Sequence, residues 1–388
     1  MYTIKVKLIA FQGASEEIIS RGEQILRNKL TDFNIEITDQ NPDVLFILTG
    51  GSENEAKGIL KNKKQILILA MTESNSYAAA TEIKAYCNQN KIDSTLYNID
   101  NEAELQSKLN YYLRSSKTLT KLKNYKIGVI GEVSEWLIAS DIENNILNTK
   151  LGVQLEKIDW NDFPKYSEYP VNTEFLNHFD NSGFNLEDSS KIYNLLKDII
   201  KQKQVDAITV ECFPLVVENA VTACLALSKL NTEGFASGCE GDITSITGKI
   251  IVKELTEQIP WMANIAGLEE DKIFFAHCTI ATDLISDYKI RTHFETNKGT
   301  AVQGKFKAEN ATVLRLNNEL SKAFVSFGKI VERPEREDSC RTQIKIEIPQ
   351  EDIAKLKENP LGNHHLLIPG DHVELLKYFC KLTGIELI

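Results

Sequence analysis

Five of the six histidines in this chain lie between His277 and His372, in its last third. Histidine is a common ligand of transition metals and its pKa lies near neutrality, so the last third is the first place to look for chemistry. Carboxylates and two short motifs share this part of the chain or lie just upstream of it. The first third contains no such cluster and is interpreted as scaffold.

The first motif is Gly238-Cys239-Glu240-Gly241-Asp242, just before an expected helix over residues 243–257. Carboxylates in this place can simply favour the positive end of the helix dipole. Glycines beside them allow the backbone to approach a ligand closely, which a substrate site also requires. Glu240 and Asp242 are therefore candidates for chemistry, with a purely structural role as the alternative.

The second motif, Gly362-Asn363-His364-His365, is the sharpest in the sequence. Adjacent residues on a strand point to opposite faces, so only one of the two histidines is expected to face a metal. The other can orient a neighbouring group or a substrate oxygen. The alternative is an ordinary surface turn that carries two histidines.

Further candidates precede the second motif. His277 follows an apolar run and lies at an expected strand end, where a hydrogen-bonded core histidine is the alternative. His293 and Glu295 alternate along the sequence, so we expect both on one face of a strand, or else as a surface pair. Arg341 can place a guanidinium in the pocket or have a surface or core role. No base partner is recognisable for the thiols, so no cysteine nucleophile is predicted.

The composition bounds the class of protein. A chain of 388 residues is too long for one core and predicts two or three domains. An apolar content of 42% and a charged content of 26% are ordinary for soluble globular proteins. The net charge of −11 argues against nucleic acid and anionic membranes as default partners. A soluble enzyme that acts on a neutral or weakly charged small molecule fits this composition.

The N-terminus and the cysteines predict the compartment. Residues 1–7 have a strand pattern without the apolar region of a signal peptide, and no apolar run has the length of a membrane span. The seven cysteines are odd in number, scattered and without a Cys-x-x-Cys pair. A reduced, cytoplasmic setting is therefore expected.

Residues 1–119 are expected to form an N-terminal domain. Apolar runs such as 43–49 and 65–70 alternate with helical stretches at about 75–89 and 101–119. Apolar strands separated by helices indicate a parallel sheet buried on both faces, so a doubly wound, Rossmann-like α/β domain is the expected result. The polar, lysine-rich segment at 115–121 is interpreted as a linker.

A second Rossmann-like domain is expected over residues 120–258. Its glycine pair, Gly128 and Gly131, does not form the Gly-x-Gly-x-x-Gly fingerprint, so no dinucleotide site is predicted. The expected elements are a strand at 126–131, a helix that begins at 134–137, a strand at 205–211 and a helix at about 214–230.

Beyond residue 259 the pattern changes, and a β-rich C-terminal domain over residues 259–388 is expected to complete the active site. Many short strands in succession suggest an antiparallel sheet or barrel. Helical patterns are scarce until about 371–383. The expected strands lie at 272–278, 287–295, 300–306, 310–316, 323–331 and 341–348.

The chain resembles the L-fucose isomerase and L-arabinose isomerase superfamily across most of its length, as a short and divergent branch. The resemblance is most specific from about Gly238 onward, through the Cys-Glu-x-Asp-like segment and the terminal glycine and histidine segment with its helix. It implies two Rossmann-like domains followed by a β-rich domain. It also implies a homo-oligomer, a trimer or a hexamer, in which a neighbouring N-terminal domain closes the pocket.

The resemblance also implies roles for individual residues. Glu240 would bind the metal and double as an acid/base group, and His365, or its neighbour His364, would be a metal ligand. His277 lies where arabinose isomerases place another histidine ligand. Asn264 stands where the family has a second catalytic carboxylate. An amide oxygen can coordinate a hard cation but cannot act as a base, so Asp242, Glu295 or a metal-bound water would substitute.

The predicted function is a metal-dependent aldose–ketose isomerase that acts on a free sugar through an ene-diolate, with Mn²⁺ as the expected cation. The alternative is an isomerase-fold protein that binds a sugar or sugar acid without isomerising it, or catalyses another step, because of Asn264. A metal-free sensor or scaffold is a third reading. The predicted site comprises catalytic Glu240, Asp242 and Glu295, metal-binding Glu240, Asn264, His365 and His277, and substrate-binding His293, His364, Asn363 and Arg341.

Overall fold

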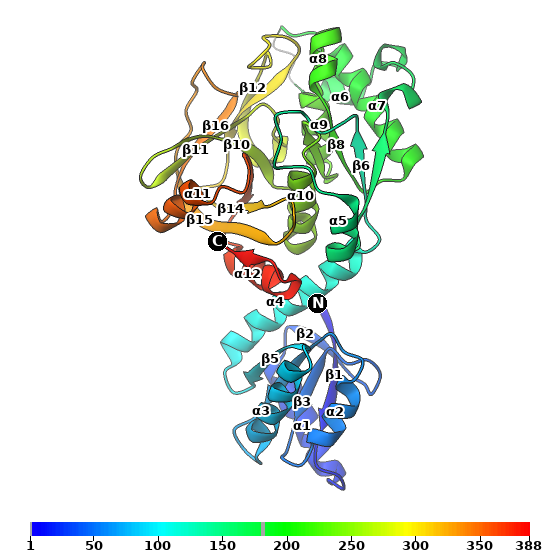
Figure 1. Cartoon of the computed structure of the whole chain (residues 1–388), viewed down its shortest axis with the longest axis vertical. Helices are drawn as coiled ribbons and strands as arrows, with labels where there is room; N and C mark the ends of the chain where they lie inside the picture. Colours follow the sequence, from blue (N-terminus) through cyan, green and yellow to red (C-terminus); the bar gives the residue numbers. More distant parts are fainter. Residues whose placement is uncertain (1, 180–182) are drawn as a thin grey trace. The chain divides into compact units, whose positions relative to one another are not determined.

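The computed structural model describes residues 2–179 and 183–388, which form a mixed α/β protein with two parallel sheets and a closed antiparallel barrel (Figure 1). The chain divides into two compact units, Met1–Arg114 and Ser115–Ile388. The domain boundaries predicted at residues 119 and 258 stay predictions, as does the Rossmann-like classification of the first two domains. No helix in the described ranges combines the length and apolar composition needed to cross a membrane.

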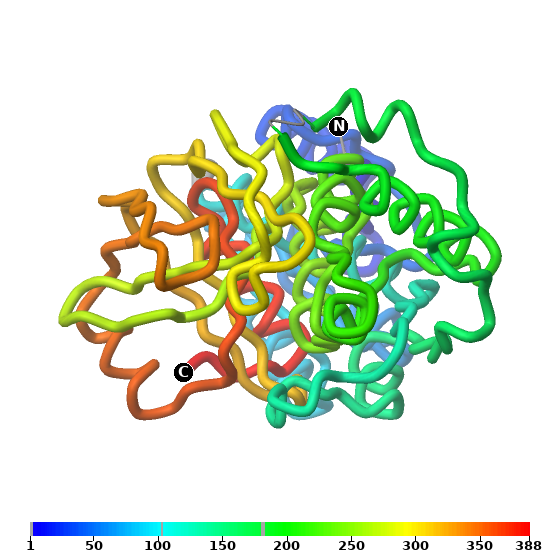
Figure 2. Tube along the Cα trace, turned by 90° about the horizontal axis from the view of Figure 1, so that it is seen from above, coloured from blue at the N-terminus to red at the C-terminus, as the bar shows by residue number. Residues whose placement is uncertain are grey.

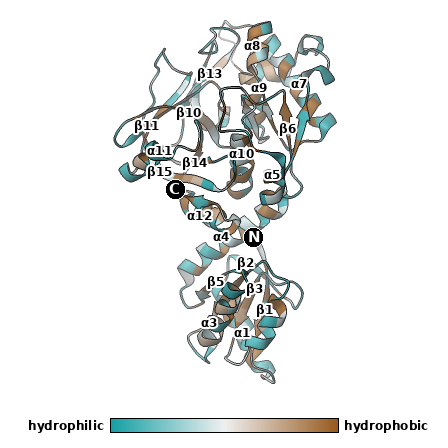
Figure 3. Ribbon diagram, viewed as in Figure 1, coloured by the Kyte–Doolittle hydropathy of each residue, from teal (hydrophilic) through white to brown (hydrophobic). Residues whose placement is uncertain are grey.

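The first unit contains a five-stranded sheet in the order β2-β1-β3-β4-β5, and every pairing in it is parallel. The predicted parallel sheet is therefore confirmed. Every residue of β3 is buried, as expected for a strand covered on both faces, and Figure 3 shows the hydrophobic colouring of these strands. The elements are β1 (Tyr2–Ile9), α1 (Glu16–Lys29), β2 (Phe33–Ile37), β3 (Val44–Ile47), α2 (Glu53–Leu60), β4 (Gln65–Ala70), α3 (Ser76–Gln89) and β5 (Asp93–Asn98).

The segment predicted as a linker at 115–121 is helical. It forms the end of α4 (Glu102–Leu122), a helix of 21 residues. Ser115 and Thr118 are buried together with Leu122, so small polar residues belong to the packed face of this helix. The linker prediction is wrong because the polar composition of the segment conceals a helical spacing that continues to Leu122.

The second parallel sheet has the order β7-β6-β8-β9. No helix begins at 134–137, because this segment forms turns across the end of β9, where the Ser134 amide donates to the carbonyl of Glu240 at 3.0 Å. The elements are β6 (Lys126–Ile130), α5 (Asn144–Leu151), β7 (Gln154–Ile158), α6 (Thr173–His178), α7 (Glu187–Lys203), β8 (Ala207–Val210) and β9 (Ser237–Cys239), with 3₁₀ turns at Trp160–Asp162 and Tyr166–Glu168.

Helices α8 (Phe213–Asn219) and α9 (Cys224–Thr232) replace the single helix predicted at 214–230. The break occurs at Ala220, whose φ of +59° lies in the left-handed region and ends α8. The helix predicted at 243–257 is confirmed as α10 (Ile243–Thr256). Almost every residue of α10 is buried, and the helix packs against barrel strands β14 and β17.

The C-terminal segment forms a closed barrel of six strands in the order β14-β17-β10-β11-β16-β15, and β15 pairs with β14 to close it. The predicted barrel is confirmed, although β10 and α11 are not among the predicted elements. Within the second unit the barrel, coloured yellow-green to red, lies beside the green helices (Figures 1 and 2). The elements are β10 (Trp261–Leu268), β11 (Lys272–His277), a 3₁₀ turn (Thr282–Leu284), β12 (Ile285–Arg291), β13 (Ala301–Phe306), β14 (Asn310–Leu316), β15 (Lys322–Glu332), β16 (Thr342–Glu347), α11 (Gln350–Glu358), β17 (His364–Pro369), α12 (Val373–Thr383) and β18 (Glu386–Leu387).

The strand predicted at 287–295 ends early. Strand β12 pairs with β13 as a two-stranded sheet and stops at Arg291, and residues 292–297 form a turn closed by the Asn297 amide on the carbonyl of His293. The expectation that His293 and Glu295 share one face of a strand is therefore wrong.

Candidate active site

Three titratable side chains meet where the second parallel sheet adjoins the barrel. Glu240 follows β9, His277 ends β11 and His364 begins β17, and one ligand atom from each lies within 4.8 Å of the other two. Oε1 of Glu240 lies 3.5 Å from Nε2 of His364 and 3.9 Å from Nε2 of His277. The sequence motifs around Glu240 and His364, 124 residues apart by their numbering, are therefore brought together by the fold.

The turn that carries Glu240 is unusual. Its φ of +62° lies in the left-handed region, which a non-glycine residue adopts only when the surroundings enforce it. Gly241 follows with φ +67°, and a Cβ placed there would lie 2.3 Å from the carbonyl oxygen of Glu132. The glycine thus lets the 131–137 loop cross directly over the turn, which fixes the direction of the Glu240 side chain.

Trp136, in that loop, is a site residue that the sequence did not reveal. Its indole Nε1–H donates to Oε2 of Glu240 at 2.6 Å, so the two carboxylate oxygens have different partners. The indole packs edge-on against Phe213 at 4.6 Å between ring centroids and is 52% exposed. Because a helix was wrongly expected at 134–137, Trp136 was not considered for the site. The one sequence feature that could have indicated it is a tryptophan in the segment that follows a predicted parallel strand.

Asp242 combines a structural role with a role in the site. It is the N-cap of α10, where its carboxylate accepts from the amide and the hydroxyl of Ser245 at 2.6 and 2.8 Å. Its Oδ2 also lies 2.9 Å from Nδ1 of His364, and the side chain is fully buried. Asp242 therefore orients His364 from behind and presents no exposed oxygen to a substrate.

Arg315 is a second site residue outside the predicted set. Its guanidinium is 2% exposed, lies 3.5 Å from Asp242 and donates to the carbonyl of His364 at 3.0 Å and to Ser140 at 2.8 Å. A Cβ at Gly362 would lie 2.2 Å from this guanidinium, which explains the glycine of the second motif. The buried cation compensates the buried carboxylate.

The charges of this network follow from its geometry. Burial favours the neutral form of His364, but Asp242 and Glu240 outweigh it and raise the pKa of the imidazole to about 9. Burial opposes ionisation of Glu240 as well, yet His364 and His277 lower the pKa of its carboxyl to about 2. Arg315 and His364 overcome burial at Asp242 and lower its pKa to about 2. Without a bound cation, an imidazolium therefore lies between two carboxylates at neutral pH.

His277 is held in a different state. Burial, with the nearby charge of His364, lowers its pKa to about 3, so the ring is neutral. The Thr279 amide donates to Nδ1 of His277 at 3.2 Å, which places the ring proton on Nε2. That N–H faces Glu240 and the sulfur of Cys239, at 3.8 Å. His277 is thus arranged as a hydrogen-bond donor, and metal ligation would require it to release Thr279.

His364 fits a metal ligand better. A ring that donates Nδ1–H to Asp242 has the lone pair of Nε2 available once the imidazolium proton is lost. That Nε2 is buried and has no hydrogen-bond partner among the described residues, and Oε1 of Glu240 lies beside it. Glu240 and His364 therefore fit a divalent cation that accepts carboxylate and imidazole ligands.

His365 points into the barrel. Its Nδ1 lies 2.9 Å from the carbonyl oxygen of Asn363, and its ring packs against Phe275 and Phe324 at 5.8 and 6.1 Å between centroids. The two histidines thus face opposite ways, as expected. The structure brings His364 to Glu240 and separates His365 from it.

Asn264 and Asn363 form a pair of their own. Asn363 donates from Nδ2 to Oδ1 of Asn264 at 2.5 Å, and Asn264 lies opposite His364 in the register of β10 and β17. The amide oxygen of Asn264 is therefore engaged by Asn363, next to the His364 backbone.

The remaining predicted residues form a neighbouring group. Nε2 of His293 lies 3.1 Å from Oε2 of Glu295, whose side chain is 45% exposed. Arg341 donates to the carbonyl and the hydroxyl of Thr292, at 2.8 and 3.2 Å. Arg341 thus holds the turn that carries His293.

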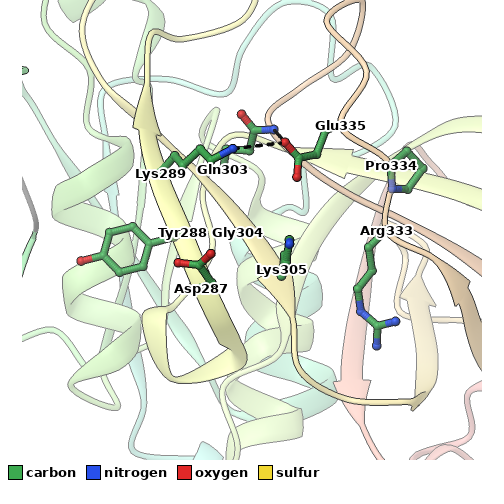
Figure 4. A pocket seen from close by; sticks show the side chains of 9 residues that line it. All are labelled: Asp287, Tyr288, Lys289, Gln303, Gly304, Lys305, Arg333, Pro334 and Glu335. Carbon is green, nitrogen blue, oxygen red and sulfur yellow. Dashed lines mark hydrogen bonds and ion pairs between the residues drawn. The ribbon is translucent and has the colours of Figure 1, made fainter. Parts of the chain in front are cut away.

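A separate pocket beside β12 and β13 contains none of the predicted site residues (Figure 4). Lys289 and Gln303 each lie 3.5 Å from Glu335, and Arg333 donates to the carbonyls of Phe306 and Ala308. Lys289, Glu335 and Arg333 are thus engaged by neighbouring protein groups, so the Glu240 cluster remains the better candidate.

No protein-family model matches the chain. Curated relatives named sulfoquinovose isomerase are similar to it over most of its length. The protein from Alkalicoccus urumqiensis is 21% identical over 76% of this chain and 71% of its own, and that from Priestia megaterium is 23% identical over 74% and 69%. The protein from Clostridium sp. (strain MSTE9) is 22% identical over 81% and 75%. These similarities support a relationship to sugar isomerases, and they do not single out the fucose and arabinose isomerases.

Proposed function

We propose that this protein is a metal-dependent aldose–ketose isomerase. The observation that carries the proposal is the alignment of Asp242, His364 and Glu240, with a buried imidazole nitrogen that has no hydrogen-bond partner in the described part of the chain. A carboxylate behind a histidine is the usual support of a metal-binding imidazole. The relatives named as isomerases of a sugar point in the same direction.

Glu240 and His364 would hold the cation, for which we propose Mn²⁺, with Co²⁺ and Fe²⁺ also suited to these ligands. The bound cation would polarise the carbonyl and hydroxyl oxygens of the sugar and so favour an ene-diolate. Asp242 fixes the ring of His364, and Arg315 neutralises Asp242 within the protein. The orientation of the His364 ring is therefore fixed by Asp242 and Arg315, before any cation binds.

The proton transfer is assigned to Glu240, which would take the proton from carbon 2 of the sugar and return it at carbon 1. Trp136 holds one oxygen of this carboxylate and leaves the other toward the two histidines. The Nε2–H of His277 would donate to a substrate oxygen. His293 and Glu295, which lie on the neighbouring turn, are proposed to bind hydroxyl groups.

The proposed substrate class is a free sugar, and a sulfonated hexose such as sulfoquinovose is the first candidate because the relatives carry that name. Assembly as a homo-oligomer is proposed from the resemblance to the fucose and arabinose isomerases. A cytoplasmic setting is proposed from the scattered, unpaired pattern of the cysteines in the sequence.

The test incubates the protein and Mn²⁺ with sulfoquinovose and with unsubstituted aldoses in D₂O. NMR follows ketose formation and deuterium uptake, at carbon 1 of the ketose and at carbon 2 of the aldose that re-forms. We expect both with at least one sugar. Glu240→Gln should abolish them, whereas the exposed Glu351→Gln, in the first turn of α11, should not. Normal turnover by Glu240→Gln would overturn the assignment.

Asn264 favours a second candidate, a protein that binds a sugar or sugar acid without isomerising it. Calorimetry distinguishes the two, because this candidate predicts heat of binding with no deuterium uptake. If Asn264→Asp gains deuterium exchange that the wild type lacks, the binding-only candidate is supported. If the wild type is active and Asn264→Asp loses that activity, the Asn264 amide is part of the native mechanism.

A further inference from the structure

A second group of metal-binding side chains lies beside the candidate active site. One ligand atom from each of Cys278, Glu295 and Cys340 lies within 4.8 Å of the other two. Sγ of Cys340 lies 3.7 Å from Oε1 of Glu295. These residues come from the end of β11, the 292–297 turn and the loop before β16, and none belongs to the Glu240 cluster.

The surroundings of these residues are compatible with a bound ion, because one ligand reaches solvent while the other two are buried. Cys278 and Cys340 are 3% and 9% exposed, in an apolar cluster that also contains Phe274. The side chain of Glu295 is 45% exposed. The sulfurs are thus shielded, while the carboxylate side remains open as an entry path for an ion.

Glu295 is already oriented by a neighbour. Its Oε2 is 3.1 Å from Nε2 of His293, and Nδ1 of His293 is 3.2 Å from the hydroxyl of Thr296. The other oxygen, Oε1, faces the sulfur of Cys340. A carboxylate held in this way by an outer hydrogen bond is typical of metal ligands.

We propose that Cys278, Cys340 and Glu295 form a binding site for a thiophilic divalent cation, of which Zn²⁺ is the best match. Two sulfurs and one carboxylate oxygen suit Zn²⁺, Co²⁺ or Cd²⁺ and leave a fourth position for water. Mg²⁺ and Mn²⁺ prefer oxygen ligands and are disfavoured. Binding would join the 292–297 turn, with His293, to the strand end that carries His277, and so would brace one side of the candidate active site.

The experiment uses the full-length protein, reduced with a phosphine, freed of metal by chelation and titrated with Co²⁺ without oxygen. Thiolate ligation of Co²⁺ gives charge-transfer absorption in the near ultraviolet, which oxygen and imidazole ligands do not give. We expect these bands in the wild type, in Glu240→Gln and in Cys380→Ser, a buried thiol of α12 that serves as the matched control. Cys340→Ser should lose them, and Glu295→Gln should weaken cobalt binding by about 10-fold or more.

The outcomes are decisive. Absence of the bands in the folded wild type, or undiminished bands in Cys340→Ser, overturns the proposal. A disulfide between Cys278 and Cys340, seen as two fewer than the seven free thiols in the unreduced protein, overturns it too. Cys278→Ser should also lose the bands, but Cys278 adjoins His277 and this variant can fail to fold. The test therefore depends on Cys340→Ser, whose fold is checked by circular dichroism. Bands retained in Glu240→Gln separate this site from the proposed function, because that variant changes the first cluster and leaves Cys278, Cys340 and Glu295 in place.

Discussion

At the scale of residues, the sequence could name the histidine pair but could not choose between its members. Alternation along a strand places His364 and His365 on opposite faces, and this expectation is confirmed. Which histidine joins the site depends on which face of β17 contacts Asp242 and which contacts Phe275. The packing of β17 against α10 and β10 determines this. Trp136 was missed for the same reason, since it does not lie near a motif in the sequence, and the contact of Arg315 with Asp242 was not predicted.

Asp242→Asn tests the support of His364 without removing the helix cap, because asparagine caps helices as well as aspartate does. The neutral amide no longer favours the Nδ1–H form of the ring. We expect the affinity for Mn²⁺ to fall about 10- to 100-fold, measured by calorimetry. The free energy of unfolding should fall as well, because Arg315 loses its buried counter-charge. Ser245→Ala, which removes one contact to Asp242, should have a smaller effect. Wild-type affinity in Asp242→Asn would contradict the assigned role.

The imidazolium of His364 predicts a pH dependence in the chelated protein. The folded-state pKa of about 9 lies above the ordinary value of 6.5, so the stabilisation is fully present below about pH 6.5 and is lost as pH rises through about 9. The advantage of the wild type over His364→Gln in free energy of unfolding, measured with urea, should therefore shrink over this range. An advantage that is constant with pH would contradict the ion network.

At the scale of elements, the sequence predicted most strands and the buried helix α10, because their apolar patterns are local. It failed where tertiary contacts override composition: the polar end of α4 is helical, and the 134–137 segment is a loop drawn over the Glu240 turn. The helical spacing at the end of α4 is masked by its polar composition, and the contact of the 134–137 segment with Glu240 leaves no periodic pattern in the sequence.

Gly241→Ala tests that turn. The new Cβ would meet the carbonyl of Glu132, and φ +67° is unfavourable for alanine, so we expect a loss of at least about 1–2 kcal/mol in unfolding free energy, with lower activity. Gly58→Ala is the matched control, because it lies inside α2 with no atom within 4 Å of the new Cβ, and it should stabilise by about 0.5–1 kcal/mol. Equal stability of the two variants would exclude a strained turn.

At the scale of the molecule, the composition and the order of elements predicted a parallel sheet first and a β-rich barrel last, and both are confirmed. The sequence named Glu240, Asp242, His277 and the histidine pair of this site, and it did not name Trp136. Its assembly from β9, β11, β17 and the 131–137 loop depends on pairings between distant parts of the chain, which local patterns do not encode.

The barrel closes through β17, which pairs with β10 on one side and with β14 on the other. Strand β17 is the last of the six barrel strands in chain order, so it is synthesised after the other five. Both parallel sheets can form cotranslationally, whereas the barrel must wait for this late, non-local pairing. Glu240 therefore acquires His364 as a neighbour only after this last barrel strand has been synthesised, and until then the nascent chain carries the carboxylate of the site without the imidazole that completes it.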